Sequence, residues 1–302
     1  MGIRDRLGDE LFRRVAGPDG AKQRDRIHGT PGPRWFEPGS PITRVHGDAS
    51  MYIGGIRAVL LQTMHPKAMT AVAEHSGYRG DMWGRLARTA TFIAVTTFGT
   101  ERHAEQTIAA VRRIHDGITG SMPDGEAYAA NDPHLLMWVH VAEIDSFLRA
   151  HQEYGAHPLT PDECDEYVRQ AGEVAARLGV VDPPQTRAEL DQVLADFRPE
   201  LRATDHAREA VAYLIRHPEL AWVQRPAYWT LVAAAVGLMP GWTRVPLRLP
   251  ILPVAERTVV RALGRLSTMT VRWAMAPIKE HTRRLDEQAR ATRPHADGAA
   301  DE

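Results

Sequence analysis

The feature that most restricts the fold of this chain is a series of segments in which apolar residues recur at helical spacing. Asp132-Pro133 and Thr160-Pro161 each place a capping side chain before a proline, the pair that typically starts a helix. There is no long run of alternating apolar and polar residues and no internal repeat. The sequence therefore predicts an all-α fold, a single domain of roughly ten helices. The predicted helices are 4–15, 49–66, 67–76, 82–99, 100–120, 133–155, 160–180, 186–201, 204–217, 228–239 and one or two within 254–291.

Three stretches of different composition divide the chain. Residues 1–45 hold a predicted N-terminal helix and a segment rich in glycine and proline, of which "GTPGPRWFEPGSP" is too punctuated for regular structure. Residues 46–291 are predicted to form the helical domain. Residues 292–302 are polar, and we expect them to be a disordered tail.

Composition excludes several classes of protein. Lys and Arg number 37 against 38 Asp and Glu, so the chain has no global basic field to attract nucleic acid. Cys164 is the only cysteine, which excludes a disulfide framework and a cysteine-ligated zinc or iron–sulfur centre. The N-terminus is too charged for a secretory signal, and the longest apolar run, 228–242, is too short to span a bilayer. We expect a cytoplasmic protein without an integral membrane segment.

Common catalytic motifs are missing from the sequence. It has no Gly-rich phosphate loop, no Gly-x-Ser-x-Gly elbow, no His-Glu-x-x-His and no Glu-x-x-His. His46-Gly-Asp48 is a possible start of a facial metal triad, but Asp48 also precedes a predicted helix. We favour the interpretation of Asp48 as a helix cap.

Histidines on apolar helix faces are the strongest candidates for a functional site. His115 lies on one face of the helix 100–120 with the apolar stripe of that helix, and His140 lies on the apolar face of 133–155. His65 ends the helix before them, in "MHP". For any single histidine, a neutral imidazole hydrogen-bonded inside the core is the more common situation. Three in one all-α chain favour a cofactor, because haem iron needs an imidazole on an apolar wall. The stripe beside His115 is Ile108, Val111, Ile114 and Ile118.

A second cluster of polar residues lies on the predicted helix 82–99. Arg85 and Thr89 are one turn apart on the same face, and Arg88 flanks them. One interpretation is that the arginine extends to solvent while Thr89 bonds to its own helix backbone. The other is a polar pocket lining that binds a carboxylate, such as a haem propionate, or donates hydrogen bonds to iron-bound oxygen.

Four motifs occur in an order that resembles a known family. The segments "LQTMHPKAMTAVAEHS", "GRLARTATFIAVTTFGT", "VRRIHDGITG" and "YAANDPHLLMWVHVAEIDSFL" resemble the catalytic domain shared by latex-clearing rubber oxygenases and MpaB-type oxygenases, over roughly residues 40–245. The resemblance implies a partly globin-like core that holds haem b through a proximal histidine. It also implies a distal Arg-x-x-x-Thr pair with a basic residue before the threonine, which Arg85, Arg88 and Thr89 match. His115 is the best match to the proximal iron ligand, and His140 is the second choice.

The resemblance implies a haem-dependent oxygenase or peroxidase-like oxidoreductase. Its reactants would be a small apolar molecule in a buried pocket and dioxygen or peroxide. The family's acidic base has no clear match, and Glu74 and Asp81 are only nearby candidates. Two alternatives remain at this point: a haem or small-ligand sensor or carrier without turnover, and a helical protein without a cofactor. A homodimer is one assembly that we consider.

Overall fold

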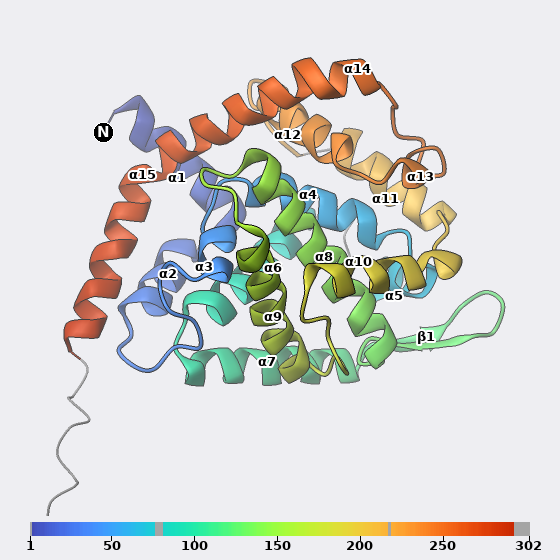
Figure 1. Cartoon of the computed structure of the whole chain (residues 1–302), viewed down its shortest axis with the longest axis horizontal. Coiled ribbons are helices and arrows are strands. Elements are labelled where there is room, and N and C mark those ends of the chain that lie inside the picture. The colour runs from blue at the N-terminus through green and yellow to red at the C-terminus, as the bar shows by residue number, and fades with distance from the viewer. Residues whose placement is uncertain (1, 76–80, 217–218, 293–302) are drawn as a thin grey trace, which may run out of the picture. The chain divides into compact units, whose positions relative to one another are not determined.

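The computed structural model describes residues 2–75, 81–216 and 219–292 (Figure 1). Helices dominate these residues, and the only strands among them form one two-stranded antiparallel sheet. The predicted all-α fold is confirmed. The helices in the first half are α1 (Ile3–Ala16), α2 (Gly20–Gly29), α3 (Pro41–His46), α4 (Met51–Gln62), α5 (Pro66–His75), α6 (Met82–Phe98) and α7 (Glu101–Asp116). Those in the second half are α8 (Pro133–Tyr154), α9 (Pro161–Leu178), α10 (Arg187–Asp196), α11 (Asp205–Arg216), α12 (Arg225–Gly237), α13 (Gly241–Arg244), α14 (Pro253–Ala255) and α15 (Arg261–Ala291).

The helical prediction needs correction at several places, among them the predicted helices 49–66 and 186–201, which end at Gln62 and Asp196, and the unpredicted helix α13. The predicted helix 100–120 ends at Asp116, and Gly117 is followed by β1 (Thr119–Ser121), which pairs with β2 (Ala127–Ala129). Strands of three residues are too short to show an alternating pattern. α2 and α3 form inside the segment for which only one helix was expected. α2 escapes recognition because it is almost entirely polar, with only Gly20 and Ile27 buried.

The chain divides into two compact units, which are described separately. Unit 1 consists of Met1–Glu37, Trp83–Thr107 and Trp273–Glu302, and unit 2 of Pro38–Met82 and Ile108–Arg272. The helices α6, α7 and α15 therefore each contribute residues to both units. The predicted domain limits at residues 45 and 291 stay predictions, and the expected disordered tail falls almost wholly on residues outside the described ranges.

In unit 1, an irregular segment is held by hydrogen bonds to backbone carbonyl oxygens. Arg34 donates from Nε to the carbonyl oxygen of Phe98 at 2.9 Å, and the Glu101 amide donates to the carbonyl oxygen of Pro33 at 2.9 Å. Phe36 is buried. The stretch rich in glycine and proline thus has no helix between residues 30 and 40 and is nevertheless fixed by defined contacts.

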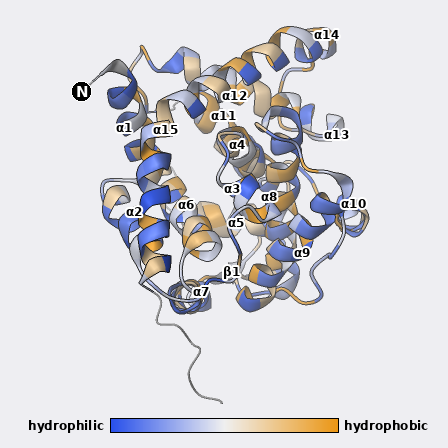
Figure 2. Ribbon diagram, turned by 60° about the vertical axis from the view of Figure 1, so that its left-hand side comes forward, coloured by the Kyte–Doolittle hydropathy of each residue, from blue (hydrophilic) through white to orange (hydrophobic). Residues whose placement is uncertain are grey.

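In unit 2, the main packing partners are α4 and α8. They come close together because Gly54 faces Phe147, where an added Cβ would lie only 3.0 Å from the phenylalanine Cδ1 atom. Ile53, Leu60, Trp138 and Leu148 are fully buried in these two helices. Figure 2 shows hydrophobic residues within α8 and a mixture of hydrophilic and hydrophobic residues along α15. The core of unit 2 therefore surrounds α8.

A charged pair is buried in this core. Arg57 on α4 places Nη2 at 2.8 Å from Oδ2 of Asp145 on α8, and both side chains are almost completely buried. Arg57 also donates to Ser146 Oγ at 2.6 Å and to the carbonyl oxygen of Leu238 at 2.9 Å. The guanidinium and the carboxylate are thus compensated by each other and by hydrogen bonds, as buried charges require.

Candidate functional site

His115 lies in the last turn of α7, within unit 2. Its side chain is half-buried, and its Nδ1 atom is buried without a hydrogen-bond partner among the described residues. Of the predicted stripe, Ile108 is buried, but Ile114 is 64% exposed, so the prediction of a continuous buried face is wrong at Ile114. The buried part of the α7 face that carries His115 is therefore narrower than the spacing of the apolar residues indicates.

Asn131 accompanies His115, and the sequence reasoning missed it. Its Nδ2 donates to Asp116 Oδ1 at 2.6 Å and to the carbonyl oxygen of Arg112 at 3.0 Å, while its Oδ1 is buried without a partner. Burial lowers the pKa of His115, and Asn131 and Asp116 oppose this shift. Asn131 Oδ1 and His115 Nδ1 are both buried, and neither has a hydrogen-bond partner among the described residues. The one sequence feature that could have drawn attention to Asn131 is its position directly before Asp132 and Pro133, where a helix was predicted to start.

His140 lies in the middle of α8 and is much more deeply buried. Its exposed fraction is 8%, and its Nε2 has no hydrogen-bond partner among the described residues. Burial lowers the pKa of His140 to about 4, so the imidazole is neutral at pH 7. One turn later, burial raises the pKa of Glu143 to about 7. A neutral imidazole with a free nitrogen is chemically able to ligate a metal.

Arg85, Arg88 and Thr89 lie on α6 in unit 1. Arg85 is half-buried, and burial together with the charge of Arg88 lowers its pKa. Thr89 donates from Oγ1 to the carbonyl oxygen of Arg85 at 3.2 Å, and both Arg88 and Thr89 are exposed. Thr89 thus bonds to its own helix, as the first interpretation describes. Because these residues and the two candidate histidines belong to different units, their joint role around an iron stays a prediction.

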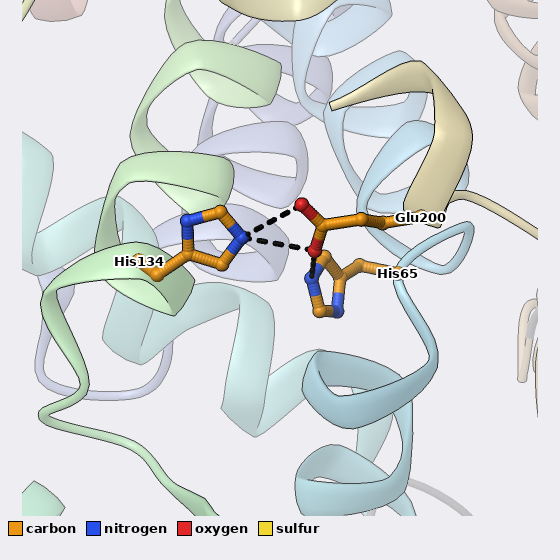
Figure 3. A group of neighbouring side chains, drawn as sticks. All are labelled: His65, His134 and Glu200. Atoms are coloured by element: carbon orange, nitrogen blue, oxygen red, sulfur yellow. Dashed lines mark hydrogen bonds and ion pairs between the residues drawn. The ribbon is translucent and has the colours of Figure 1, made fainter. Parts of the chain in front are cut away.

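A third group of residues meets in unit 2, and sequence reasoning had singled out only one of them. His65 precedes α5, His134 lies in the first turn of α8, and Glu200 ends the 3₁₀ turn η1 (Arg198–Glu200). Their ligand atoms all lie within 4.8 Å of one another (Figure 3). His134 Nε2 is 2.9 Å from Glu200 Oε2, and His65 Nε2 is 3.5 Å from the same oxygen. Glu200 is 66 residues from His134, so no sequence spacing reveals this cluster.

Aromatic packing and backbone contacts hold the cluster together. The His65 ring lies 6.1 Å from the Trp138 ring and 6.2 Å from the Phe197 ring, measured between centroids. His134 lies 4.6 Å from Phe197. Asp132 caps α8 by accepting the His134 amide at 2.9 Å, which fixes the turn that carries His134.

Within the described ranges, His46 and Asp48 are not part of a facial metal triad. Asp48 accepts the Ser50 amide at 2.8 Å and forms a two-pronged ion pair with Arg272, at 2.9 and 3.0 Å. Burial raises the pKa of Asp48, but the hydrogen bonds from Arg272 and Ser50 outweigh it and hold the pKa below its usual range. Burial lowers the pKa of His46 to about 3. Among the described residues neither belongs to a metal-binding cluster, and the role of Asp48 beside α4 is structural.

The two acidic candidates for a base differ in their surroundings. Glu74 on α5 accepts a hydrogen bond from the Tyr128 hydroxyl on β2. Burial and this carboxylate raise the pKa of Tyr128 to about 12. Asp81 is exposed directly before α6. Glu74 is thus engaged with a tyrosine, and the assignment of a base stays open.

Comparison with known proteins identifies one family. The sequence model of the family described as "ER-bound oxygenase mpaB/B'/Rubber oxygenase, catalytic domain" matches residues 43–272. No curated protein and no solved structure matches the chain. In the described part of the chain, no helix has both the length and the apolar character needed to cross a bilayer.

Proposed function

We propose, from the premise that this chain belongs to the mpaB and rubber oxygenase catalytic-domain family, that it is a haem b-dependent oxygenase of a small apolar molecule. The family match, over more than half of the chain, is the observation that carries the oxygenase activity. Dioxygen or peroxide is the proposed oxidant. The haem, its ligand and the substrate go beyond the family match, and we argue them from the residues.

The donor groups of unit 2 fit haem iron. His115 has one ring nitrogen, Nδ1, buried beside Asn131, and this arrangement leaves Nε2 for a metal. His140 offers an unpartnered Nε2 in apolar surroundings. We propose His115 as the iron ligand, because it has a neighbouring acceptor to orient its ring, and His140 as the alternative. Bound haem supplies the dioxygen chemistry that amino-acid side chains lack.

The chain's own residues have three tasks in this proposal. His115 would hold the iron, and Asn131 Oδ1, after a small adjustment, would accept a hydrogen bond from the Nδ1–H group of His115, which would fix the ring and leave Nε2 deprotonated. From the family resemblance alone, Arg85, Arg88 and Thr89 would bind a carboxylate of the cofactor or donate hydrogen bonds to the reacting oxygen. The proposed pocket of apolar side chains binds the substrate and excludes water.

A visible spectrum after expression with haem supply tests the cofactor. We expect Soret absorbance in the purified protein, and its absence would overturn the haem proposal. His115→Ala should lose most of the bound haem, while His157→Ala, at an exposed histidine of the same unit, should keep it. Loss in His140→Ala together with retention in His115→Ala would assign the ligand to His140.

Turnover is tested separately. Arg85→Ala and Thr89→Ala should keep more haem than His115→Ala and lose product formation from an apolar substrate with dioxygen or peroxide. A haem-loaded wild-type protein that forms no product from either oxidant across apolar substrates would support a sensor or carrier instead.

A further inference from the structure

We propose that His65, His134 and Glu200 bind one divalent transition-metal ion, at a site independent of the proposed iron ligands. Two imidazoles and one carboxylate are a donor set that zinc and ferrous iron accept, whereas calcium and magnesium prefer oxygen donors alone. The proposal stands on the positions of the three side chains and does not depend on haem binding.

The distances between the donor atoms suit a common ion. In a tetrahedral zinc site with bonds of about 2.0–2.1 Å, the ligand atoms lie about 3.3 Å apart. Glu200 Oε2 lies 2.9 Å from His134 Nε2 and 3.5 Å from His65 Nε2, on either side of that value. Figure 3 shows both imidazoles turned toward the carboxylate. Binding an ion at this point requires only small side-chain adjustments.

An unpartnered buried nitrogen points into the same place. The His65 side chain is only 3% exposed, and its Nε2 has no hydrogen-bond partner in the part of the chain that the structure describes. Its separation of 3.5 Å from Glu200 exceeds the roughly 2.7–2.9 Å expected of a direct hydrogen bond between charged groups. Leaving a buried polar atom unsatisfied is unfavourable. A cation between the two side chains satisfies the imidazole and the carboxylate at once.

The site is both anchored and accessible. His65 packs against Trp138 and Phe197, and the Arg202 amide donates to the carbonyl oxygen of Met64 at 2.9 Å, which ties the segment after η1 to the segment before α5. His134 and Glu200 have side chains that are 54% and 45% exposed. An ion can therefore enter from solvent, and a coordination position remains for water or another ligand.

Calorimetric titration of the chelator-treated full chain with zinc chloride, without added haem, tests the proposal. We expect saturable binding of one ion per chain, weakened about tenfold or more by His134→Ala and by Glu200→Gln, since each removes one ligand. His157→Ala is the matched control and should bind like the wild type. Because His134 and Glu200 are half-exposed, these variants should fold, and circular dichroism checks that they do.

Two further measurements make the assignment specific. Cobalt(II) in place of zinc should give the strong visible bands of a four-coordinate ion, and His134→Ala should abolish them. His115→Ala should keep its zinc affinity, while His134→Ala should keep its Soret band, so that failure of this proposal and failure of the haem proposal are distinguishable. Absence of saturable zinc binding, or binding that both His134→Ala and Glu200→Gln leave unchanged, overturns the site.

Discussion

Asp145 and His140 are buried polar residues five positions apart on α8, and their hydrogen-bonding surroundings are opposite. Asp145 is compensated by Arg57 at 2.8 Å and by Arg149 at 2.7 Å. His140 is also buried, yet its Nε2 has no partner among the described residues. A carboxylate in the interior needs its counter-charge, whereas an imidazole avoids much of the cost by staying neutral. The Asp145 carboxylate therefore stabilises the fold, whereas the His140 imidazole keeps a lone pair available for a ligand.

The largest effect should follow from breaking the compensated pair. Asp145→Ala leaves the Arg57 guanidinium buried without its main partner and should lower the free energy of unfolding by about 3–5 kcal/mol. Urea denaturation of the haem-free protein measures this. Asp191→Ala is the control, because Asp191 is 49% exposed and pairs with Arg149 and Arg187 at the surface, and it should cost about 0–1 kcal/mol. Equal losses in the two variants would show that Arg57 finds other partners.

His140 should have little effect on the stability of the folded protein at neutral pH and should lower that stability in acid. Its pKa of about 4 in the folded protein lies below the ordinary 6.5, so the unfolded chain binds more protons between these values. The contribution of His140 to stability is therefore complete above pH 6.5 and is lost as the pH falls to 4. His140→Leu should unfold within about 1 kcal/mol of wild type at pH 7 and be more stable than wild type by up to about 3 kcal/mol at pH 4. A large loss of stability in His140→Leu at pH 7 would show that the His140 imidazole has a stabilising partner in the folded protein.

Glu143, one turn away, should show the opposite pH dependence. Its pKa of about 7 in the folded protein lies above the ordinary 4.5, so the folded chain binds more protons, and stability falls as the pH rises from 4.5 through 7. Glu143→Gln should gain about 1–3 kcal/mol over wild type at pH 8, allowing for its partial exposure, and gain nothing at pH 4. Thermal unfolding at the two values of pH measures this, and a pH-independent difference would contradict the assignment.

The smallest expected effect concerns Asn131. If its Oδ1 orients His115, Asn131→Ala should speed haem loss about tenfold, while Asn131→Asp, which keeps an acceptor oxygen, should restore retention in part. Transfer of haem to an acceptor protein measures the rate, and the visible spectrum reports the strength of the iron ligand. If the two variants behave alike in rate and spectrum, Asn131 serves only to join α7 to the segment before α8.

Sequence reasoning predicted the parts of the fold that depend on local interactions. α8 and α9 begin at their expected prolines because Asp132 and Thr160 cap them, and Thr160 also forms a reciprocal pair with Glu163. The end of α7 and the polar helix α2 were missed, because a three-residue strand has no visible period and α2 buries almost nothing. The exposure of Ile114 shows that spacing identifies a helical face and leaves open whether another element covers it.

The candidate sites divide in the same way. The sequence could single out His115 and His140 as candidates because they lie among apolar residues of their own helices, and their role as ligands stays a prediction. His134 and Glu200 join His65 only through the tertiary packing of three segments, and Asn131 contacts α7 through Asp116. Side chains that meet across large sequence separations leave no local pattern to recognise.

The helix α8 carries His134 in its first turn and His140 near its middle. Six residues of α-helix rise about 9 Å, and a well-packed helix holds that interval constant. A paramagnetic ion seated at His134 would therefore broaden the nuclear magnetic resonance signals of His140 by an amount set by a known separation. Because α8 fixes this separation, a change in the broadening of the His140 signals would report a change in the surroundings of His140.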